Sequence, residues 1–95
     1  MGIRRVVLDV DKGLIRPTLV ELARAIEAVP GVDAVNILVT EMDMETMGTS
    51  ITVEGEDIDF ERLIETIEDT GSAVHSVDEI AVGKRLIENT KKTRD

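Results

Sequence analysis

Residues 18–43 have the sequence TLVELARAIEAVPGVDAVNILVTEMD, which predicts a helix followed directly by a strand. Thr18 and Glu21 have the spacing of a capping box, in which each side chain accepts a hydrogen bond from a backbone amide of the first turn. Pro30 and Gly31 end the helix, because proline cannot continue it and glycine adopts the left-handed conformation common after a helix. The helix has apolar residues at helical spacing that predict one buried stripe: Leu19, Leu22, Ala23 and Ile26.

The strand over residues 32–43 alternates apolar and polar side chains, with Val35, Ile37 and Val39 on one side. Residues 50–54 also alternate, and residues 44–49 are short enough to join the two strands as an antiparallel hairpin. A second helix follows, for which Asp59 is the predicted cap and Gly71 the predicted end. Its apolar stripe consists of Phe60, Leu63, Ile64 and Ile67.

Two more β-type runs flank these elements. The first covers residues 3–10, and the polar residues 11–13 are expected to break it. The last covers residues 73–82, where Val74, Val77 and Ile80 are three residues apart. This spacing does not fit strict alternation, so it predicts a bulge or bend near Ser76.

The predicted order β-α-β-β-α-β favours an α+β, ferredoxin-like two-layer sandwich, with a four-stranded antiparallel sheet and two helices on one face. A single domain is expected over residues 1–82. The other face of the sheet is then uncovered, and the alternation assigns it both apolar and charged residues: Arg5, Val7, Asp9, Leu38, Met42, Thr52 and Glu54. A mixed, uncovered face on so small a domain favours contact with a second copy or a ligand.

The composition of the chain limits the classes of partner that the protein is expected to bind. The chain has 95 residues and a net charge of −9, which disfavours binding to the phosphates of nucleic acid. Phe60 is the only aromatic residue, so no platform exists for stacking bases. No apolar run is long enough to span a membrane, no cysteine is present, and the start resembles no cleaved signal, so we expect a cytoplasmic protein without a membrane partner.

Charge is unevenly distributed along the chain. Residues 83–95 carry five bases and two acids, whereas the rest of the chain is strongly acidic. This basic C-terminal tail is expected to contact an acidic patch on the same or a neighbouring copy. The sequence leaves open whether the tail is ordered at such a contact.

Three segments resemble an archaeal family of small proteins known as the domain of unknown function number 211. They are residues 3–9 (IRRVVLD), residues 31–37 together with 41–46, and residues 72–79 (SAVHSVDE), in which residues 75–79 are the most specific part. The resemblance covers nearly the whole chain. It implies a ferredoxin-like fold and assembly into oligomers, and it supplies no established activity.

The polar residues suggest two candidate sites. His75 is the only histidine, and it lies beside Ser76 and two acids, with Asp9 as a further candidate for a polar site or subunit contact. Neighbouring residues on a regular strand point to opposite faces, so His75 and Ser76 diverge unless the chain bends. We therefore expect no catalytic residues and no enzyme activity.

A metal site is the second candidate. Glu41, Asp43 and Glu45 alternate along one strand, and Asp78 with Glu79 form a weaker pair. Oxygen ligands of this type suit calcium or magnesium. The alternation also places the three acids on the core side, so they must lie beyond the helix layer or the strand must bend.

Two functions remain. The first is a non-catalytic module that assembles with itself into a homo-oligomer and binds or senses an unknown small ligand where subunits meet. The second is a protein that binds divalent cations through its clustered carboxylates. No cofactor is established by the sequence, and calcium or magnesium is the expected ion in the second case.

Overall fold

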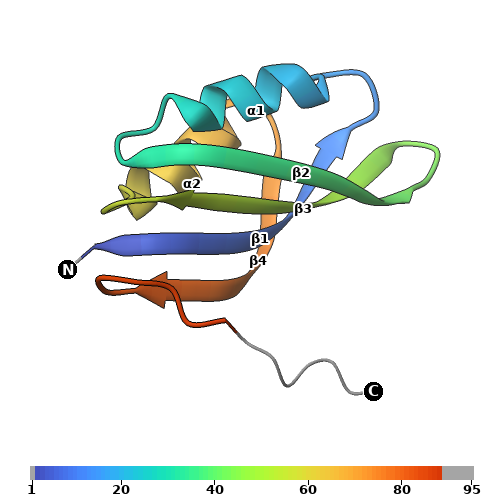
Figure 1. Cartoon of the computed structure of the whole chain (residues 1–95). Coiled ribbons are helices and arrows are strands. Elements are labelled where there is room, and N and C mark those ends of the chain that lie inside the picture. The colour runs from blue at the N-terminus through green and yellow to red at the C-terminus, as the bar shows by residue number, and fades with distance from the viewer. Residues whose placement is uncertain (1, 89–95) are drawn as a thin grey trace, which may run out of the picture.

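The computed structural model describes residues 2–88 and confirms the order β-α-β-β-α-β (Figure 1). Its elements are β1 (Ile3–Gly13), α1 (Leu19–Glu27), β2 (Val32–Met42), β3 (Thr46–Gly55), α2 (Phe60–Asp69) and β4 (Ala73–Val82). The sheet has the strand order β2-β3-β1-β4, and every neighbouring pair is antiparallel. The predicted α+β, ferredoxin-like fold is confirmed.

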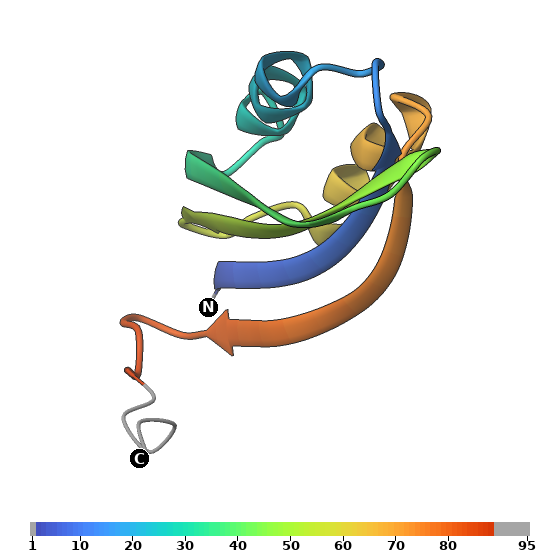
Figure 2. The ribbon, with the colours of Figure 1, turned by 90° about the vertical axis from the view of Figure 1, so that its right-hand side faces the viewer.

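Both helices lie on the same side of the curved sheet (Figure 2). Each helix begins at the residue that its predicted cap indicates. Thr18 and Glu21 form the capping box, with two hydrogen bonds of 3.0 Å. The Asp59 carboxylate accepts a hydrogen bond from the Arg62 amide. The core between helices and sheet consists of Val6, Leu8, Val10, Leu22, Ile26, Val29, Ile51, Val53, Ile58, Leu63 and Ile67.

Strand β1 is three residues longer than predicted, and residues 11–13 do not break it. They pair with residues 46–48 at the start of β3, so the strand continues as long as it has a partner. The side chain of Lys12 therefore lies on the helix side, almost fully buried, and its ammonium donates a hydrogen bond of 2.7 Å to the carbonyl of Gly13. Asp11 falls on the opposite, open face.

The turn between β2 and β3 is shorter than the predicted linker over residues 44–49. Asp43 closes it: its carboxylate accepts hydrogen bonds of 2.9 Å from the amides of both Glu45 and Thr46. Side-chain bonds of this type hold tight turns together. Pairing of the two strands consequently begins at Met42 and Met47.

Strand β2 has an irregular register that changes the predicted faces. Val39 pairs with Thr49, but Glu41 pairs with Gly48, so Thr40 is an extra residue in the strand. A bulge of this kind shifts the alternation by one residue. Glu41 therefore lies on the open face and Met42 on the helix side, whereas simple alternation placed each on the other face.

The irregularity predicted in the last strand is confirmed. The register between β1 and β4 shifts at three places. Arg4 is the extra residue on β1 at one of them, and His75 and Asp78 are the extra residues on β4 at the other two. The two extra residues of β4 flank Ser76, where the bend was expected. These shifts allow Val74, Val77 and Ile80 to share the helix side of the sheet despite their three-residue spacing.

The part of the chain after β4 is described up to Glu88. Within residues 2–88, no helix is long and apolar enough to cross a membrane. Residues 89–95, the greater part of the predicted basic tail, lie outside the described residues.

Candidate binding pocket on the open face of the sheet

A hollow of about 260 Å³ lies on the open face, near the β2–β3 hairpin. All four strands contribute to its lining, because the register brings residues from each strand to the same level of the sheet. The lining residues, which we call the acidic pocket, are Asp9, Asp11, Thr40, Glu41, Gly48 and His75. The predicted site residues Asp9, His75 and Glu41 thus come together.

Gly48 forms the floor of the acidic pocket. It has no side chain, and a Cβ atom built there would lie 3.4 Å from the Thr40 hydroxyl oxygen and 3.6 Å from a carboxylate oxygen of Asp11. These are ordinary contact distances, so an alanine would fill the floor without a clash. Glycine at this position therefore keeps the space between Asp11 and Glu41 open.

His75 reaches the pocket because of the bulge in β4. Its Nδ1 atom lies 3.7 Å from a carboxylate oxygen of Asp9, and both side chains are partly exposed. Ser76 pairs with Asp9 across the strands and therefore shares the open face. The chain bends as was required for His75 and Ser76 to face the same side. The Ser76 hydroxyl, however, donates to Asp78 at 2.8 Å rather than to the histidine.

The pocket is strongly acidic. It contains three carboxylates and one imidazole, and Glu41 is fully on the exposed surface. Among the salt bridges formed within residues 2–88, none involves Asp11 or Glu41. Such a group of carboxylates attracts a positively charged group that donates hydrogen bonds.

The structure does not assemble the predicted metal site. Asp43 and Glu45 line a separate hollow at the hairpin turn, away from Glu41. The two backbone amides and the Thr46 hydroxyl that donate to Asp43 lower the pKa of its carboxyl group. Nowhere in residues 2–88 do three or more histidine or acidic side chains lie close enough to hold a metal ion.

The second predicted pair of acids, Asp78 and Glu79, is also divided. Glu79 belongs to a cluster around Arg5, whose guanidinium donates to Glu54 at 2.9 Å, to Glu79 at 3.3 Å and to Glu88 at 3.4 Å. The hydrogen bond to Glu54 is the main cause that raises the pKa of Arg5. We call these four residues the Arg5 cluster, and they lie on the open face toward the other end of β1.

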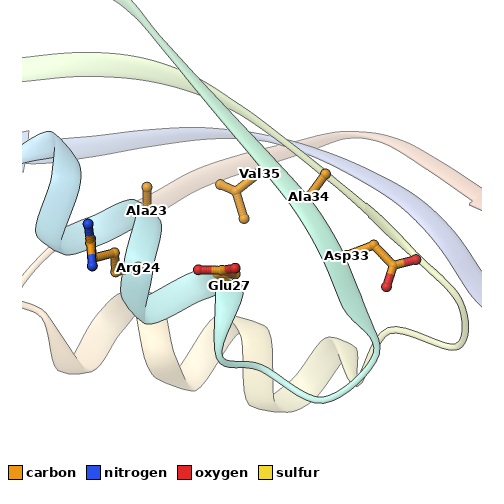
Figure 3. Close-up of a pocket in the computed structure, with 6 residues that line it drawn as sticks. All are labelled: Ala23, Arg24, Glu27, Asp33, Ala34 and Val35. Atoms are coloured by element: carbon orange, nitrogen blue, oxygen red, sulfur yellow. The ribbon is translucent and has the colours of Figure 1, made fainter.

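A further hollow of about 270 Å³ lies between α1 and β2 (Figure 3). Arg24 of α1 and Asp33 of β2 lie at its opposite ends, and small apolar side chains and the carboxylate of Glu27 lie between them. None of the predicted site residues contributes to it. The acidic pocket therefore remains the candidate site.

Sequence reasoning missed three residues of the pocket, Asp11, Thr40 and Gly48. Gly48 was assigned only to the linker of the hairpin. Asp11 was assigned to a strand break, although its spacing from Asp9 is the strand period, and this spacing was the available signal. Thr40 enters through the β2 bulge, for which the local sequence gives no signal.

Two comparisons with known proteins identify the family. Residues 4–95 match the model of the DUF211 family, described as "Uncharacterized ArCR". The chain is also 39% identical to "Uncharacterized protein MJ0319" of Methanocaldococcus jannaschii over 94 residues, which cover 99% of this chain and 96% of that protein. Neither description names an activity. This chain belongs to the archaeal DUF211 family, as the resemblance of its strand segments predicts.

Proposed function

We propose that the protein is a non-catalytic module that assembles with itself through the outer strands of its sheet and holds a positively charged group in the acidic pocket. The observation that carries the assembly is the exposure of apolar side chains on both outer strands. On β2 these are Leu38, Val39 and Met42, and on β4 they are Val77, Ile80 and Val82, all between 42% and 63% exposed.

Outer strands of a sheet carry unpaired backbone groups on one edge, and soluble proteins usually protect such edges with charged residues. Here each edge combines unpaired backbone with exposed apolar groups. A second copy that covers either strand removes this apolar surface from water, at about 25 cal/mol for each Å². The domain is small, so the additional buried surface is a substantial gain.

Light scattering tests the assembly. At about 10 μM we expect a mass several times the 10.4 kDa of one chain. Ile80→Glu places a charge at a partly exposed position of the outer strand β4 and is expected to reduce that mass. Ile15→Glu, in the loop before α1, introduces the same charge outside both outer strands and serves as the control. A wild-type protein that scatters as a single chain contradicts the proposal.

The choice of a positive group follows from the charges of the pocket. The three carboxylates of Asp9, Asp11 and Glu41 face a hollow whose described lining offers them only His75 as a partner. A ligand with amino groups is expected to raise the melting temperature, since a ligand at 100 times its dissociation constant stabilises the folded state by about 2.7 kcal/mol.

Thermal unfolding with spermidine as the probe tests this part. We expect the melting temperature of the wild type to rise, and the double variant Asp11→Asn with Glu41→Gln to show less than half of that rise. Glu65→Gln with Glu68→Gln removes the same charge from α2, so it is the matched control. Equal shifts in the pocket variant and the control contradict a ligand in the pocket. Magnesium or calcium chloride in parallel tests the divalent-cation alternative.

A further inference from the structure

The two outer strands carry opposite charges at the same end of the sheet (Figure 1). Asp33 lies at the start of β2, and Lys84 and Arg85 follow the end of β4. At the other end of the sheet, β2 has Glu41 and β4 has His75. Within residues 2–88, neither Asp33, Glu41, Lys84 nor Arg85 takes part in an ion pair. These charges therefore have no counter-ion among the described residues and are available to a second copy.

Contacts between identical edges bring like charges together. Where one sheet continues across a two-fold axis, the two adjoining strands are antiparallel. A β2–β2 contact centred on Ile37 then places Asp33 of one copy opposite Glu41 of the other. A β4–β4 contact at the middle of that strand places Asp78 and Glu79 of both copies side by side. Like charges directly opposite each other destabilise paired strands, so neither contact suits the charges of the edges.

A contact between β4 of one copy and β2 of the next brings opposite charges together. If the helices of both copies lie on the same side of one continuous sheet, these two strands are antiparallel, as every neighbouring pair within one copy is. Lys84 then lies at the same end as Asp33 of the next copy, and His75 lies at the same end as its Glu41. Complementary charge of this kind selects one partner surface over another.

One register of this contact also aligns the faces of the two strands. The helix side of β2 carries Val35, Ile37, Val39 and Met42, and the helix side of β4 carries Val74, Val77, Ile80 and Val82. When Val35 is paired with Val82, Ile37 is paired with Ile80. The extra residues in each strand then allow Val39 to pair with Val77 and Met42 with Val74. Apolar side chains that are partly exposed in one copy thus gain apolar neighbours from the next.

The same register places Lys84 opposite Asp33, which links the contact to a hollow. Asp33 lies at one end of the hollow between α1 and β2, and Arg24 lies at the other (Figure 3). Lys84 of the neighbouring copy approaches the Asp33 end, so two copies contribute charged residues to one hollow. The ion pair at that end forms only in the assembly.

We propose that β4 of one copy pairs with β2 of the next in this antiparallel register and continues the sheet from copy to copy. This inference rests on the assembly in the proposed function, and it specifies which two edges meet. Each copy uses a different edge toward each neighbour, so a pair of chains leaves one edge of each kind free. Contacts of this type continue until the chain of copies closes into a ring. The oligomer accordingly contains more than two chains.

Disulfide trapping tests which edges meet. The chain has no cysteine, so introduced thiols are the only ones present. Asn36→Cys on β2 and Ala81→Cys on β4 occupy paired positions on the open face in the proposed register. Directly paired residues have Cα atoms about 4.5–5.5 Å apart, which suits a disulfide. Within one copy two strands separate β2 from β4, a distance of about 14 Å, so a link joins different copies.

The two single variants are unfolded together in urea, refolded and oxidised with glutathione disulfide. We expect linked pairs of chains from the mixture and none from either variant alone. Glu65→Cys, on the exposed surface of α2, replaces Asn36→Cys in the control mixture and is expected to give no link. A link from Asn36→Cys alone means that β2 meets β2, and a link from Ala81→Cys alone means that β4 meets β4. Either of these results, or no link in the mixture, overturns the inference.

Charge reversal tests the pair of Asp33 and Lys84. Asp33→Lys and Lys84→Asp are each expected to raise the concentration at which half of the chains assemble by about threefold to tenfold, because attraction becomes repulsion. Combined in one chain, the two changes restore the opposite charges and are expected to recover most of the assembly. Glu68→Lys, which makes the same change of charge on α2, is the control and is expected to leave that concentration nearly unchanged. A combined variant that assembles no better than the single ones overturns the register.

The light-scattering mass of the wild type distinguishes failure of the inference from failure of the proposed function. If the wild type scatters as several chains but the mixture gives no link, the inference alone fails. A mass that stays at two chains as the concentration rises also overturns the inference alone, because contacts between unlike edges do not stop at a pair. If the wild type scatters as a single chain, the inference and the proposed assembly fail together.

Discussion

The two faces of β1 share one backbone but differ in the burial and the charge of their side chains. On the helix side Val6, Leu8 and Val10 are completely buried in the core. On the open side Arg5, Asp9 and Asp11 remain partly exposed, and each takes part in the Arg5 cluster or lines the acidic pocket. One strand thus separates the apolar packing that stabilises the fold from the charges that are available to a partner. Changes on the two sides are expected to have different consequences.

The largest difference is expected from shortening a buried side chain. Leu8→Ala removes a fully buried leucine and leaves a cavity between the sheet and the helices, which costs about 2–5 kcal/mol. Urea unfolding at a fixed protein concentration measures this loss, since assembly makes stability depend on concentration. Val7 precedes Leu8 and lies on the open face, so Val7→Ala is the control and is expected to cost about 1 kcal/mol or less. Equal losses at the two positions contradict the division between faces.

A smaller effect is expected on the open face, at Arg5. Its side chain is only 15% exposed and forms ion pairs with three glutamates, so Arg5→Met leaves Glu54, Glu79 and Glu88 to repel one another without a cation between them. Individual exposed ion pairs contribute about 0.2–1 kcal/mol, and for this cluster we expect a loss of about 1–2 kcal/mol.

Salt provides the diagnostic for Arg5. In about 1 M salt the screening length falls to about 3 Å, so the loss is expected to shrink. Arg62→Met is the control, because Arg62 lies 3.9 Å from Glu65 on an exposed helix surface and is expected to change stability very little. A loss at Arg5 that does not depend on salt contradicts an electrostatic origin and indicates lost packing of the arginine stem.

Most of the fold was predictable because its signals are local. The capping residues Thr18 and Asp59 and the apolar stripes of both helices lie within a few residues of one another, and the structure places them as expected. The ends of β1 and β3 were not predictable in this way. They depend on pairing between residues 11–13 and 46–48, which are far apart in the sequence.

The site was predictable only in part, for the same reason. Asp9 and His75 were identified as a polar site from residue type alone, and they do meet. Glu41 was identified as an acid but was assigned to the wrong face, because the extra residue Thr40 changes the register of β2. A strand bulge is set by the partner strand, so the local pattern of β2 did not reveal it.

The smallest expected effect concerns Asp43, which tests whether a carboxylate in the hairpin acts locally. Hydrogen bonds from the amides of Glu45 and Thr46 lower its pKa below the ordinary value of 3.8. The folded hairpin therefore gains stability that is fully present above pH 3.8 and is lost as the pH falls through the lowered pKa. An NMR titration of those two amide signals is expected to have its midpoint below pH 3.8. Asp43→Asn keeps an oxygen acceptor without a titrating charge, so the same signals are expected to stay constant over this range. A midpoint at or above the ordinary value means that the charged carboxylate does not hold the turn, and the shape of the hairpin must then come from pairing of the strands alone.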